Sequence, residues 1–279
     1  MKKKTKIIGI LLFRDEDVFI KKCILGVIDF VDQLIILDNN SKDNSTEIVK
    51  KIKKIFNKKI IYKKIKKISV SHKFIEKYAG KKIWVMKVDA DEIYDKKRLK
   101  IFRKEILKGK YDNIWVIKGA MLNVFTHNEK NKKISGFFSP PSQNSCEIYN
   151  FNLINFWKDC KIERLHYGKI QFKKGCQNTI KVTNNWFKSS YRCLHYCFER
   201  RSTNSKNIFT LNKAPFEIVG SYRLIKSQVK FTIKILYSYL LLKRNIINLI
   251  KIVFIKKFIS IRKIEQYSRG KLHKDIIPW

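Results

Sequence analysis

The stretch Lys82–Glu92 (KIWVMKVDADE) sets the expectation for the whole fold. Its first seven residues are mostly apolar and rich in β-branched and aromatic side chains, which favours a buried strand. Asp89 and Asp91 follow at once, and both side chains would point to the same side if the chain stays extended. Two close carboxylates repel each other unless a cation lies between them, and hard oxygen ligands suit Mg²⁺ or Mn²⁺. The stretch therefore predicts a cation-binding carboxylate pair at a strand end.

Outward from this strand, short apolar runs alternate with amphipathic stretches. Further strands are expected at 7–13, 33–37, 59–62, 113–118 and 121–125, and helices at 17–30, 45–56 and 96–107. Asn44 and Glu47 have the spacing of a helix-capping pair. Alternation of this kind predicts an α/β fold, with a mostly parallel, Rossmann-like sheet flanked by helices.

The regular pattern stops after the last of these strands. Residues 127–145 are polar, contain Gly136 and the pair Pro140 and Pro141, and are long for a connection inside a compact domain. A flexible substrate loop and a merely mobile connection both fit this segment. Residues 228–264 mix apolar residues with Lys and Arg, which predicts helices with one basic face. Such helices either pack on the domain or lie flat on an anionic membrane surface.

The formal net charge of +39 is the main argument for a different class of protein. It would suit a non-catalytic protein that binds nucleic acid or an anionic membrane. Only 11 of the 62 basic residues are Arg, however, and Arg is the side chain preferred for bidentate contacts to phosphate and guanine. Lys, Ile and Asn are abundant together, as in proteins encoded by AT-rich genes. We expect no nucleic-acid partner, and the basic binding protein is kept as the alternative.

Six cysteines do not make a disulfide scaffold in a chain of 279 residues. Cys193 and Cys197 bracket His195, but this spacing fits no common zinc finger. Residues 1–13 join a basic head to seven apolar residues, too few to span a bilayer, and no small-residue cleavage site follows. We expect a cytoplasmic protein, either free or peripheral on the inner face of the cytoplasmic membrane.

A second polar segment, Asp38–Thr46 (DNNSKDNST), also follows directly on a predicted strand. In open α/β sheets ligands bind at the carboxyl ends of the strands, so this loop and Asp89–Glu92 are expected to converge on one site. A solvated turn that caps the next helix would explain Asp43, Asn44 and Ser45 without any function.

These segments resemble motifs of the family-2 glycosyltransferases. Asp38–Thr46 resembles their D-x-x-S-x-D-x-T signature, and Asp89–Glu92 resembles their D-x-D motif in the form D-A-D-E. Leu12–Glu16 (LFRDE) is similar to the V-R-N-E opening of one branch, with Asp15 where that branch has Asn. The order and spacing of the three agree with the family.

A fourth element extends the resemblance toward the C-terminus. Leu194–Ser202 (LHYCFERRS) resembles the H-Y-x-x-R-S element of the same branch, with one extra residue, so Arg201 is a better match than Arg200. The resemblance covers residues 7–125 and, less fully, 190–206.

The resemblance implies a GT-A type fold, a UDP- or GDP-linked sugar donor and a divalent cation, Mn²⁺ or Mg²⁺. The implied activity is a hexosyltransferase-like reaction with inversion, on a glycan or lipid-linked acceptor in the synthesis of cell-envelope polysaccharide or glycolipid. We expect the catalytic domain over 1–227, with a nucleotide-sugar half up to about 125 and an acceptor half over 126–227. A basic helical extension over 228–279 follows. Nucleotidyl transfer or hydrolysis is a competing reaction class, but it usually needs a Gly-rich phosphate loop, which Gly9 alone does not make.

Carried over position by position, the resemblance implies that Asp38 contacts the base, Asp89 the ribose or the metal, and Asp91 the metal. Further donor contacts are expected from Arg14, Glu16, Asn40, Ser41, Asp43 and Arg201. In relatives of this fold a late histidine commonly completes the metal site. His195 is the candidate here, and His166, within the similar run LHYG, competes with it.

Inverting transfer also needs a carboxylate that deprotonates the acceptor hydroxyl. The acidic pair that usually supplies this base in family 2 has no clear counterpart. Glu92, Glu147 and Asp159 are the candidates by position.

Overall fold

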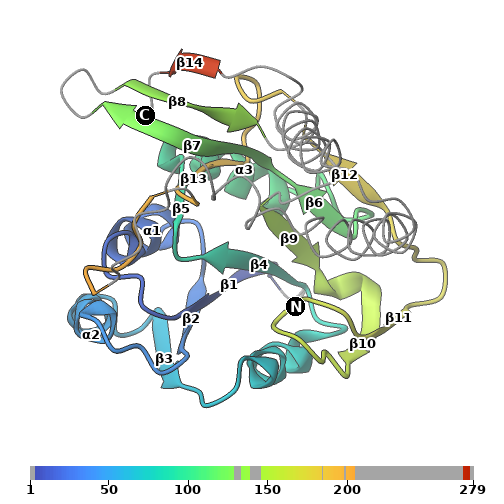
Figure 1. Cartoon of the computed structure of the whole chain (residues 1–279). Coiled ribbons are helices and arrows are strands. Elements are labelled where there is room, and N and C mark those ends of the chain that lie inside the picture. The colour runs from blue at the N-terminus through green and yellow to red at the C-terminus, as the bar shows by residue number, and fades with distance from the viewer. Residues whose placement is uncertain are drawn as a thin grey trace, which may run out of the picture.

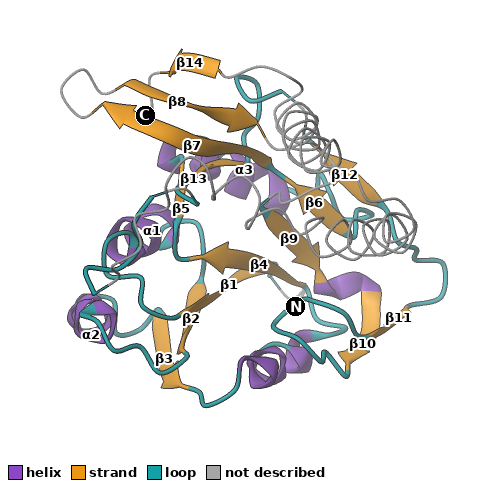
Figure 2. Ribbon diagram, in the orientation of Figure 1, coloured by secondary structure: helices purple, strands orange, loops and turns teal. Residues whose placement is uncertain are grey.

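Two β-sheets form the framework of the computed structural model, which describes residues 4–128, 133–138, 146–183, 185–197, 199–204 and 273–276 (Figures 1 and 2). The larger sheet has seven strands in the order β12-β6-β9-β4-β1-β2-β3. They are β1 (Lys6–Phe13), β2 (Gln33–Asp38), β3 (Ile60–Lys64), β4 (Ile83–Asp89), β6 (Val116–Lys118), β9 (Glu147–Asn150) and β12 (Ile180–Val182). β1 to β4 run parallel, whereas β9 is antiparallel to both of its neighbours.

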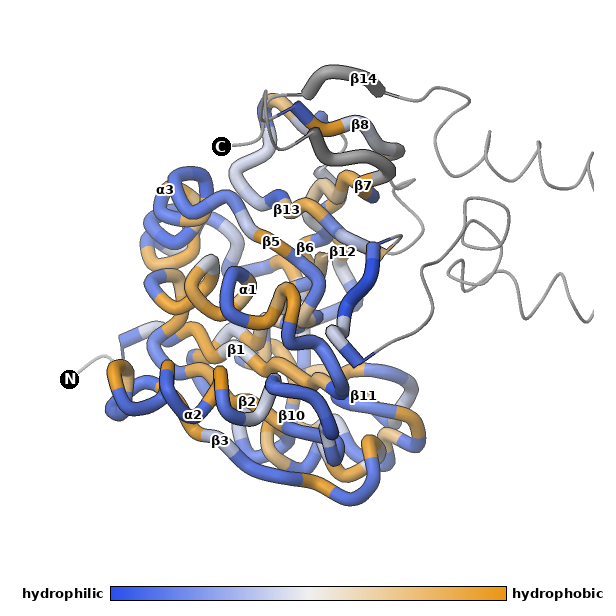
Figure 3. The backbone as a smooth tube through the Cα atoms, turned by 60° about the vertical axis from the view of Figure 1, so that its left-hand side comes forward, coloured by the Kyte–Doolittle hydropathy of each residue, from blue (hydrophilic) through white to orange (hydrophobic). Residues whose placement is uncertain are grey.

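Both faces of this sheet are covered by other elements. Alternate residues of β1 are therefore buried on opposite sides of the sheet. Ile7 and Leu11 share a core with α1 (Ile20–Val27), α2 (Ser45–Ile55) and α3 (Lys96–Leu107). Ile8 and Ile10 instead pack in a second core with short 3₁₀ turns and with the hairpin of β10 (Ile154–Lys158) and β11 (Lys169–Phe172). The apolar strands accordingly lie inside and the hydrophilic segments outside (Figure 3).

The smaller sheet has five strands in the order β14-β8-β7-β13-β5. They are β5 (Glu92–Tyr94), β7 (Ala120–Asn128), β8 (Lys133–Phe138), β13 (Arg192–His195) and β14 (His273–Ile276). β4 ends at Asp89 and β5 begins at Glu92, so one short turn carries the chain from the large sheet into the small one. The sequence-predicted carboxylate pair therefore lies where the two sheets meet.

The α/β prediction is confirmed, and the predicted helix over 96–107 has the observed bounds of α3. Two expectations are wrong. Part of the segment 127–145 is regular, because β8 pairs antiparallel with β7. Asn44 precedes α2 but its side chain makes no capping hydrogen bond; the Ser45 N–H donates to Asp43 Oδ1 instead, at 2.9 Å.

The expected basic helices over 228–264 lie outside the described residues, so the boundary at 227 stays a prediction. In the described part of the chain, none of the helices has the length and apolar character that a bilayer crossing requires.

Gly119 forms a second link between the sheets, since it lies between β6 and β7. Its N–H donates to the Cys146 carbonyl at 2.8 Å. A Cβ added there would clash with Cys146 Sγ and would lie 2.6 Å from the Tyr191 carbonyl oxygen. Only a glycine fits at this approach without movement of its neighbours.

Gly119→Ala is expected to lower the free energy of unfolding by about 1–3 kcal/mol, the usual cost of overpacking a tight site. Urea unfolding followed by circular dichroism measures this loss. Lys100→Ala, at an exposed position of α3, is the matched control and is expected to stay within about 0.5 kcal/mol of the wild type. Equal stability of the two variants would contradict the packing argument.

Candidate functional site

The turn between β4 and β5 separates the two carboxylates. The chain turns at Ala90 and Asp91, so the extended geometry expected from the sequence does not hold. Glu92 closes the turn, since its Oε2 accepts hydrogen bonds from the Asp89 N–H at 3.2 Å and from the Tyr94 hydroxyl at 2.6 Å. Burial and the charge of Asp89 raise the pKa of Glu92 to about 7.

Asp89 is held by two cations of the protein itself. Arg164 Nη2 donates to its Oδ1 at 2.6 Å, and Lys87 Nζ lies 3.3 Å from its Oδ2. Burial alone would raise the pKa of Asp89, but Lys87 and Arg164 outweigh it and hold that pKa far below its ordinary value. Asp89 is therefore an ionised carboxylate that is already neutralised locally.

Asp91 faces a different set of groups. β13 pairs antiparallel with β5, which puts His195 opposite Glu92, and the Tyr196 N–H donates to the Asp91 carbonyl at 3.0 Å. His195 Nε2 lies 3.4 Å from Asp91 Oδ2, while His195 Nδ1 lies 2.8 Å from Asn123 Oδ1. An amide oxygen can only accept, so Nδ1 carries a proton and Nε2 is aimed at Asp91. This is the arrangement that orients a metal-binding histidine.

Arg201 and Glu16 complete the surroundings of Asp91. Arg201 Nη1 lies 3.4 Å from Asp91 Oδ2 and 3.1 Å from Glu16 Oε1. Glu16 is 7% exposed, and its Oε2 has no hydrogen-bond partner in the described part of the chain. Burial and the charge of Asp91 raise the pKa of Glu16 to about 9, although Arg201 acts in the opposite direction. At neutral pH Glu16 therefore keeps its proton, and Arg201 lies between this neutral carboxyl and the Asp91 carboxylate.

Asp38, at the end of β2, is buried and hydrogen-bonded within the protein. It is 0% exposed, and its Oδ1 accepts a hydrogen bond from the Ser41 N–H at 2.8 Å. Its Oδ2 accepts from the Thr46 hydroxyl at 2.6 Å and from the Tyr62 hydroxyl at 2.8 Å. Burial would raise the pKa of Asp38, but these donors lower it below its ordinary value. In this geometry Asp38 shapes the loop after β2, and its contact with the base stays a prediction.

Asp43 joins three of the sequence motifs. Its Oδ2 accepts from the Ser202 hydroxyl at 2.7 Å and from the Asp17 N–H at 3.1 Å. The Glu16 N–H donates to the Ser45 hydroxyl at 2.8 Å. The segment around Arg201 is therefore docked on the loops that follow β1 and β2, and the late motif shares a site with the early ones.

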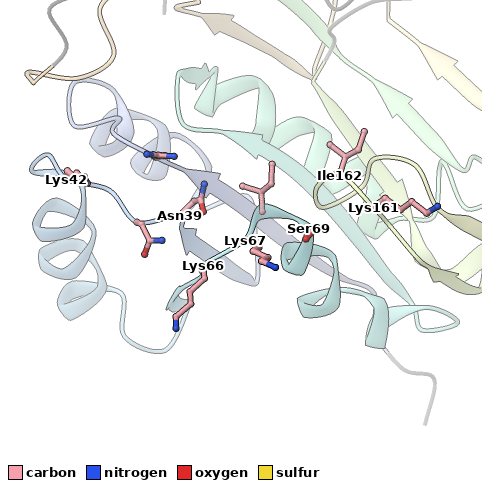
Figure 4. A pocket seen from close by; sticks show the side chains of 10 residues that line it. Asn39, Lys42, Lys66, Lys67, Ser69, Lys161 and Ile162 are labelled. Atoms are coloured by element: carbon pink, nitrogen blue, oxygen red, sulfur yellow. The ribbon is translucent and has the colours of Figure 1, made fainter.

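A pocket of about 740 Å³ opens at the carboxyl ends of β1, β2 and β3. Its lining comes from the loops after these strands and from the segment after β10, as Figure 4 shows. The residues are Arg14, Asn39, Asn40, Lys42, Lys66, Lys67, Ile68, Ser69, Lys161 and Ile162. Five of them are cationic and none is acidic, which suits an anionic ligand. Asn40 has a left-handed backbone (φ 59°), a conformation that asparagine tolerates better than most residues.

A model of glycosyl transferase family 2 matches residues 10–162. The chain belongs to this family. It is 24% identical over 274 residues to the uncharacterized glycosyltransferase MG060 of Mycoplasma genitalium, a match that covers 90% of this chain and 89% of that protein. The family-2 assignment by resemblance is thereby confirmed, together with the GT-A type of fold.

Two solved structures are also similar to this family-2 chain. One is residues 1–349 of TarS from S. aureus in complex with UDP, with 18% identity, 68% of this chain and 60% of that chain covered, and a TM-score of 0.41. The other is the mannosyltransferase PcManGT from Pyrobaculum calidifontis in complex with GDP-Man and Mn²⁺, with 11% identity, 42% and 36% covered, and a TM-score of 0.33. This chain thus spans about three fifths and about a third of these two structures.

The remaining predicted residues of the family-2 site lie apart from Asp91. Glu147 is tied to Lys118 at 3.1 Å and accepts from the Tyr149 hydroxyl at 2.5 Å. Asp159 follows β10 and pairs with Lys169 at 3.7 Å, and no described contact joins it to the turn after β4. His166 lies beside Glu163, at 3.4 Å, so His195 is the histidine at Asp91. Among the described residues, no group of three or more His, Cys, Asp or Glu is arranged to hold a metal by protein ligands alone.

Sequence reasoning missed the groups that hold the site in place. Lys87 carried a usable signal, because a lysine two residues before Asp89 in an otherwise apolar strand needs a partner when it is buried. Arg164 and Asn123 gave no signal of this kind. They reach the site from other elements, and nothing in their local sequence marks them.

The protonated state of Glu16 gives a prediction about pH in metal-free buffer with EDTA. Its pKa is about 9 in the folded protein against 4.5 ordinarily, so the folded chain keeps a proton that the unfolded chain loses. The free energy of unfolding should fall between about pH 5 and 9, with at most about 1.4 kcal/mol per pH unit from this group. Glu16→Gln cannot ionise and should lose that part of the slope in urea unfolding. Glu76→Gln, an exposed site, is the control; equal slopes in all three proteins would mean that Glu16 is ionised when folded.

Proposed function

We propose that this family-2 glycosyltransferase moves a sugar from a nucleoside diphosphate sugar to a glycan or lipid-linked acceptor, with the help of a divalent cation. The observation that carries the proposal is the adjacency of two features at one edge of the large sheet. The pocket with five cationic and no acidic side chains suits a nucleoside diphosphate. β4 pairs in parallel with β1, so Asp89 lies opposite Leu12, two residues before Arg14 of the pocket lining. In the turn that follows Asp89, Asp91 and its neighbour His195 offer a carboxylate and an oriented imidazole.

The residues at Asp91 fit a divalent cation. Mg²⁺ and Mn²⁺ at phosphate-transfer sites are often bound by one or two protein ligands, with substrate phosphates and water filling the other positions. A carboxylate and an imidazole therefore suffice, and a cluster of three ligands is not required. The buried Glu16 Oε2 has no partner among the described residues, so a polar atom of this site is left for a bound group to satisfy. When bound, such a cation supplies Lewis-acid stabilisation of the leaving diphosphate.

Asp89 and Asp91 take separate roles in this proposal. Asp91 and His195 would hold the cation, because the partners of Asp91 are an imidazole and a half-exposed Arg201 and not, as at Asp89, a lysine and a buried arginine. Asp89 is fixed by Arg164 and Lys87, so its accessible edge is suited to hydroxyls of the ribose. Arg201 lies at Asp91 and is half-exposed, so it can add positive charge as the diphosphate leaves. Asn39 and Asn40 offer amide groups to the nucleoside within the pocket.

The family suggests the class of acceptor, and the positive charge of the chain suggests where the protein acts. We propose an acceptor in a cell-envelope polysaccharide or glycolipid, with inversion at the transferred carbon. Peripheral membrane attachment through residues 228–264 is part of the same proposal. Removal of residues 228–279 followed by sedimentation with anionic vesicles tests the attachment.

Asp91→Asn is expected to abolish cation-dependent donor binding, because the amide removes the negative ligand. The measurement is a thermal-shift screen of UDP- and GDP-linked sugars, with Mn²⁺ or with EDTA. A ligand at 100 times its dissociation constant stabilises the wild type by about 2.7 kcal/mol, which shifts its Tm by several degrees. The variant should show less than a fifth of that shift.

Glu76→Gln, which changes an exposed carboxylate away from the site, should keep the full shift. Equal stabilisation of the wild type in Mn²⁺ and in EDTA would rule out the cation. A full shift in Asp91→Asn would rule out Asp91 as its ligand.

A further inference from the structure

The loop between β10 and β11 runs from the rim of the cationic pocket to the turn after β4. Lys161 and Ile162 line the pocket (Figure 4), and Arg164 pairs with Asp89 at 2.6 Å. Glu163 lies between these two contacts in the chain. We propose that Glu163 is the general base that removes the proton from the acceptor hydroxyl, an inference that rests on the proposed function.

One oxygen of Glu163 is anchored and the other is open. Arg164 Nη2 donates to Glu163 Oε1 at 2.9 Å and, with the same nitrogen, to Asp89 Oδ1. His166 Nε2 lies 3.4 Å from the same Glu163 oxygen. No hydrogen bond or ion pair with the described residues engages Oε2, and the side chain is 23% exposed. One guanidinium nitrogen thus ties the base to the donor-site carboxylate and leaves an oxygen free for substrate.

Arg164 is itself rigidly placed, which a positioning residue requires. Its side chain is 3% exposed, and its Nη1 donates to the Val88 carbonyl at 2.8 Å. Its N–H donates to the Ser71 hydroxyl at 2.7 Å, and its carbonyl oxygen contacts His72 Nδ1. Two contacts of Arg164 thus join the loop that carries Glu163 to the strand that carries Asp89, and two more fix Arg164 to Ser71 and His72.

The other described carboxylates near the turn are less suited to the acceptor. Glu92 is 3% exposed and its Oε2 closes the turn. Glu16 is buried against Arg201 and Asp91. Glu147 is engaged by Lys118 and Tyr149, and Asp159 has no described contact to the turn. Glu163 combines partial exposure with a fixed link to Asp89.

The acceptor hydroxyl oxygen forms a bond to the anomeric carbon of the donor sugar, and the bond from that carbon to the diphosphate oxygen breaks. The diphosphate leaves with the electron pair of that bond. The hydroxyl proton passes to Glu163 Oε2, and a water molecule takes the place of the acceptor in slow hydrolysis of the donor.

Glu163→Gln separates donor binding from turnover, because the amide can still accept from Arg164 but cannot take a proton. The substrate is the UDP- or GDP-linked sugar that shifts the wild type most in the thermal screen, in Mn²⁺, with water as acceptor. Release of the nucleoside diphosphate should fall about 10²- to 10⁴-fold, the usual contribution of a general base. The dissociation constant for the donor should stay within threefold. Glu163→Asp, which keeps a carboxylate, should recover part of the rate, and Glu76→Gln should match the wild type.

Three outcomes would overturn the inference, and they are distinguishable. A Glu163→Gln protein that turns over within threefold of the wild type removes Glu163 as the base and leaves the proposed function intact. Loss of donor binding together with turnover makes Glu163 a binding or structural residue. A wild type that binds no nucleotide sugar and releases no nucleoside diphosphate in Mn²⁺ overturns the proposed function as well.

Discussion

The arrangement of the site depends on one constraint, the two-residue turn through which the chain leaves the large sheet and enters the small one. β4 brings Asp89 to the edge where parallel strands end, and β5 starts at Glu92 and pairs with β13. That pairing fixes His195 opposite Glu92 and beside Asp91, although His195 and Asp91 are about a hundred residues apart in the chain. Because both sheets are packed, neither carboxylate can drift without breaking strand pairing. The chemistry of the site is thus a consequence of where two sheets are joined.

Asp89 and Asp91 look equivalent in the sequence, but they have different charged neighbours in the structure. Buried charges need partners, and the protein provides them unequally. Asp89 has Lys87 and the buried Arg164, so its charge is compensated from within. Asp91 has an imidazole and a half-exposed Arg201, with the protonated Glu16 nearby. In the proposed function, Asp91 is therefore the carboxylate that a cation would join.

Much of the frame was predictable because it rests on local patterns. The apolar runs that become β1, β2 and β4 and the amphipathic run that becomes α3 are set by period and length, and the loops after the strands follow from the parallel order. The site was predictable only where a motif marked it. Arg164 reaches Asp89 from a loop 75 residues away, and Asn123 orients His195 from β7, so neither has a local signal. Asp38 lies in a visible motif, but the sequence did not show that the Thr46 and Tyr62 hydroxyls would both donate to its carboxylate.

The net charge of +39 and the acidic site do not conflict, because they act over different distances. An excess of Lys over the surface raises the local concentration of an anionic nucleotide sugar, and salt screens that attraction beyond about 10 Å. Within the site the buried carboxylates determine the local electrostatic potential, since salt screens charge pairs that are removed from water much less. A purely basic surface would attract any polyanion equally. The pocket at the ends of β1 to β3 has five cationic side chains, and Asp89 and Asp91 follow at the end of β4, the neighbour of β1, so the proposed ligand, a diphosphate with a divalent cation, would suit both groups.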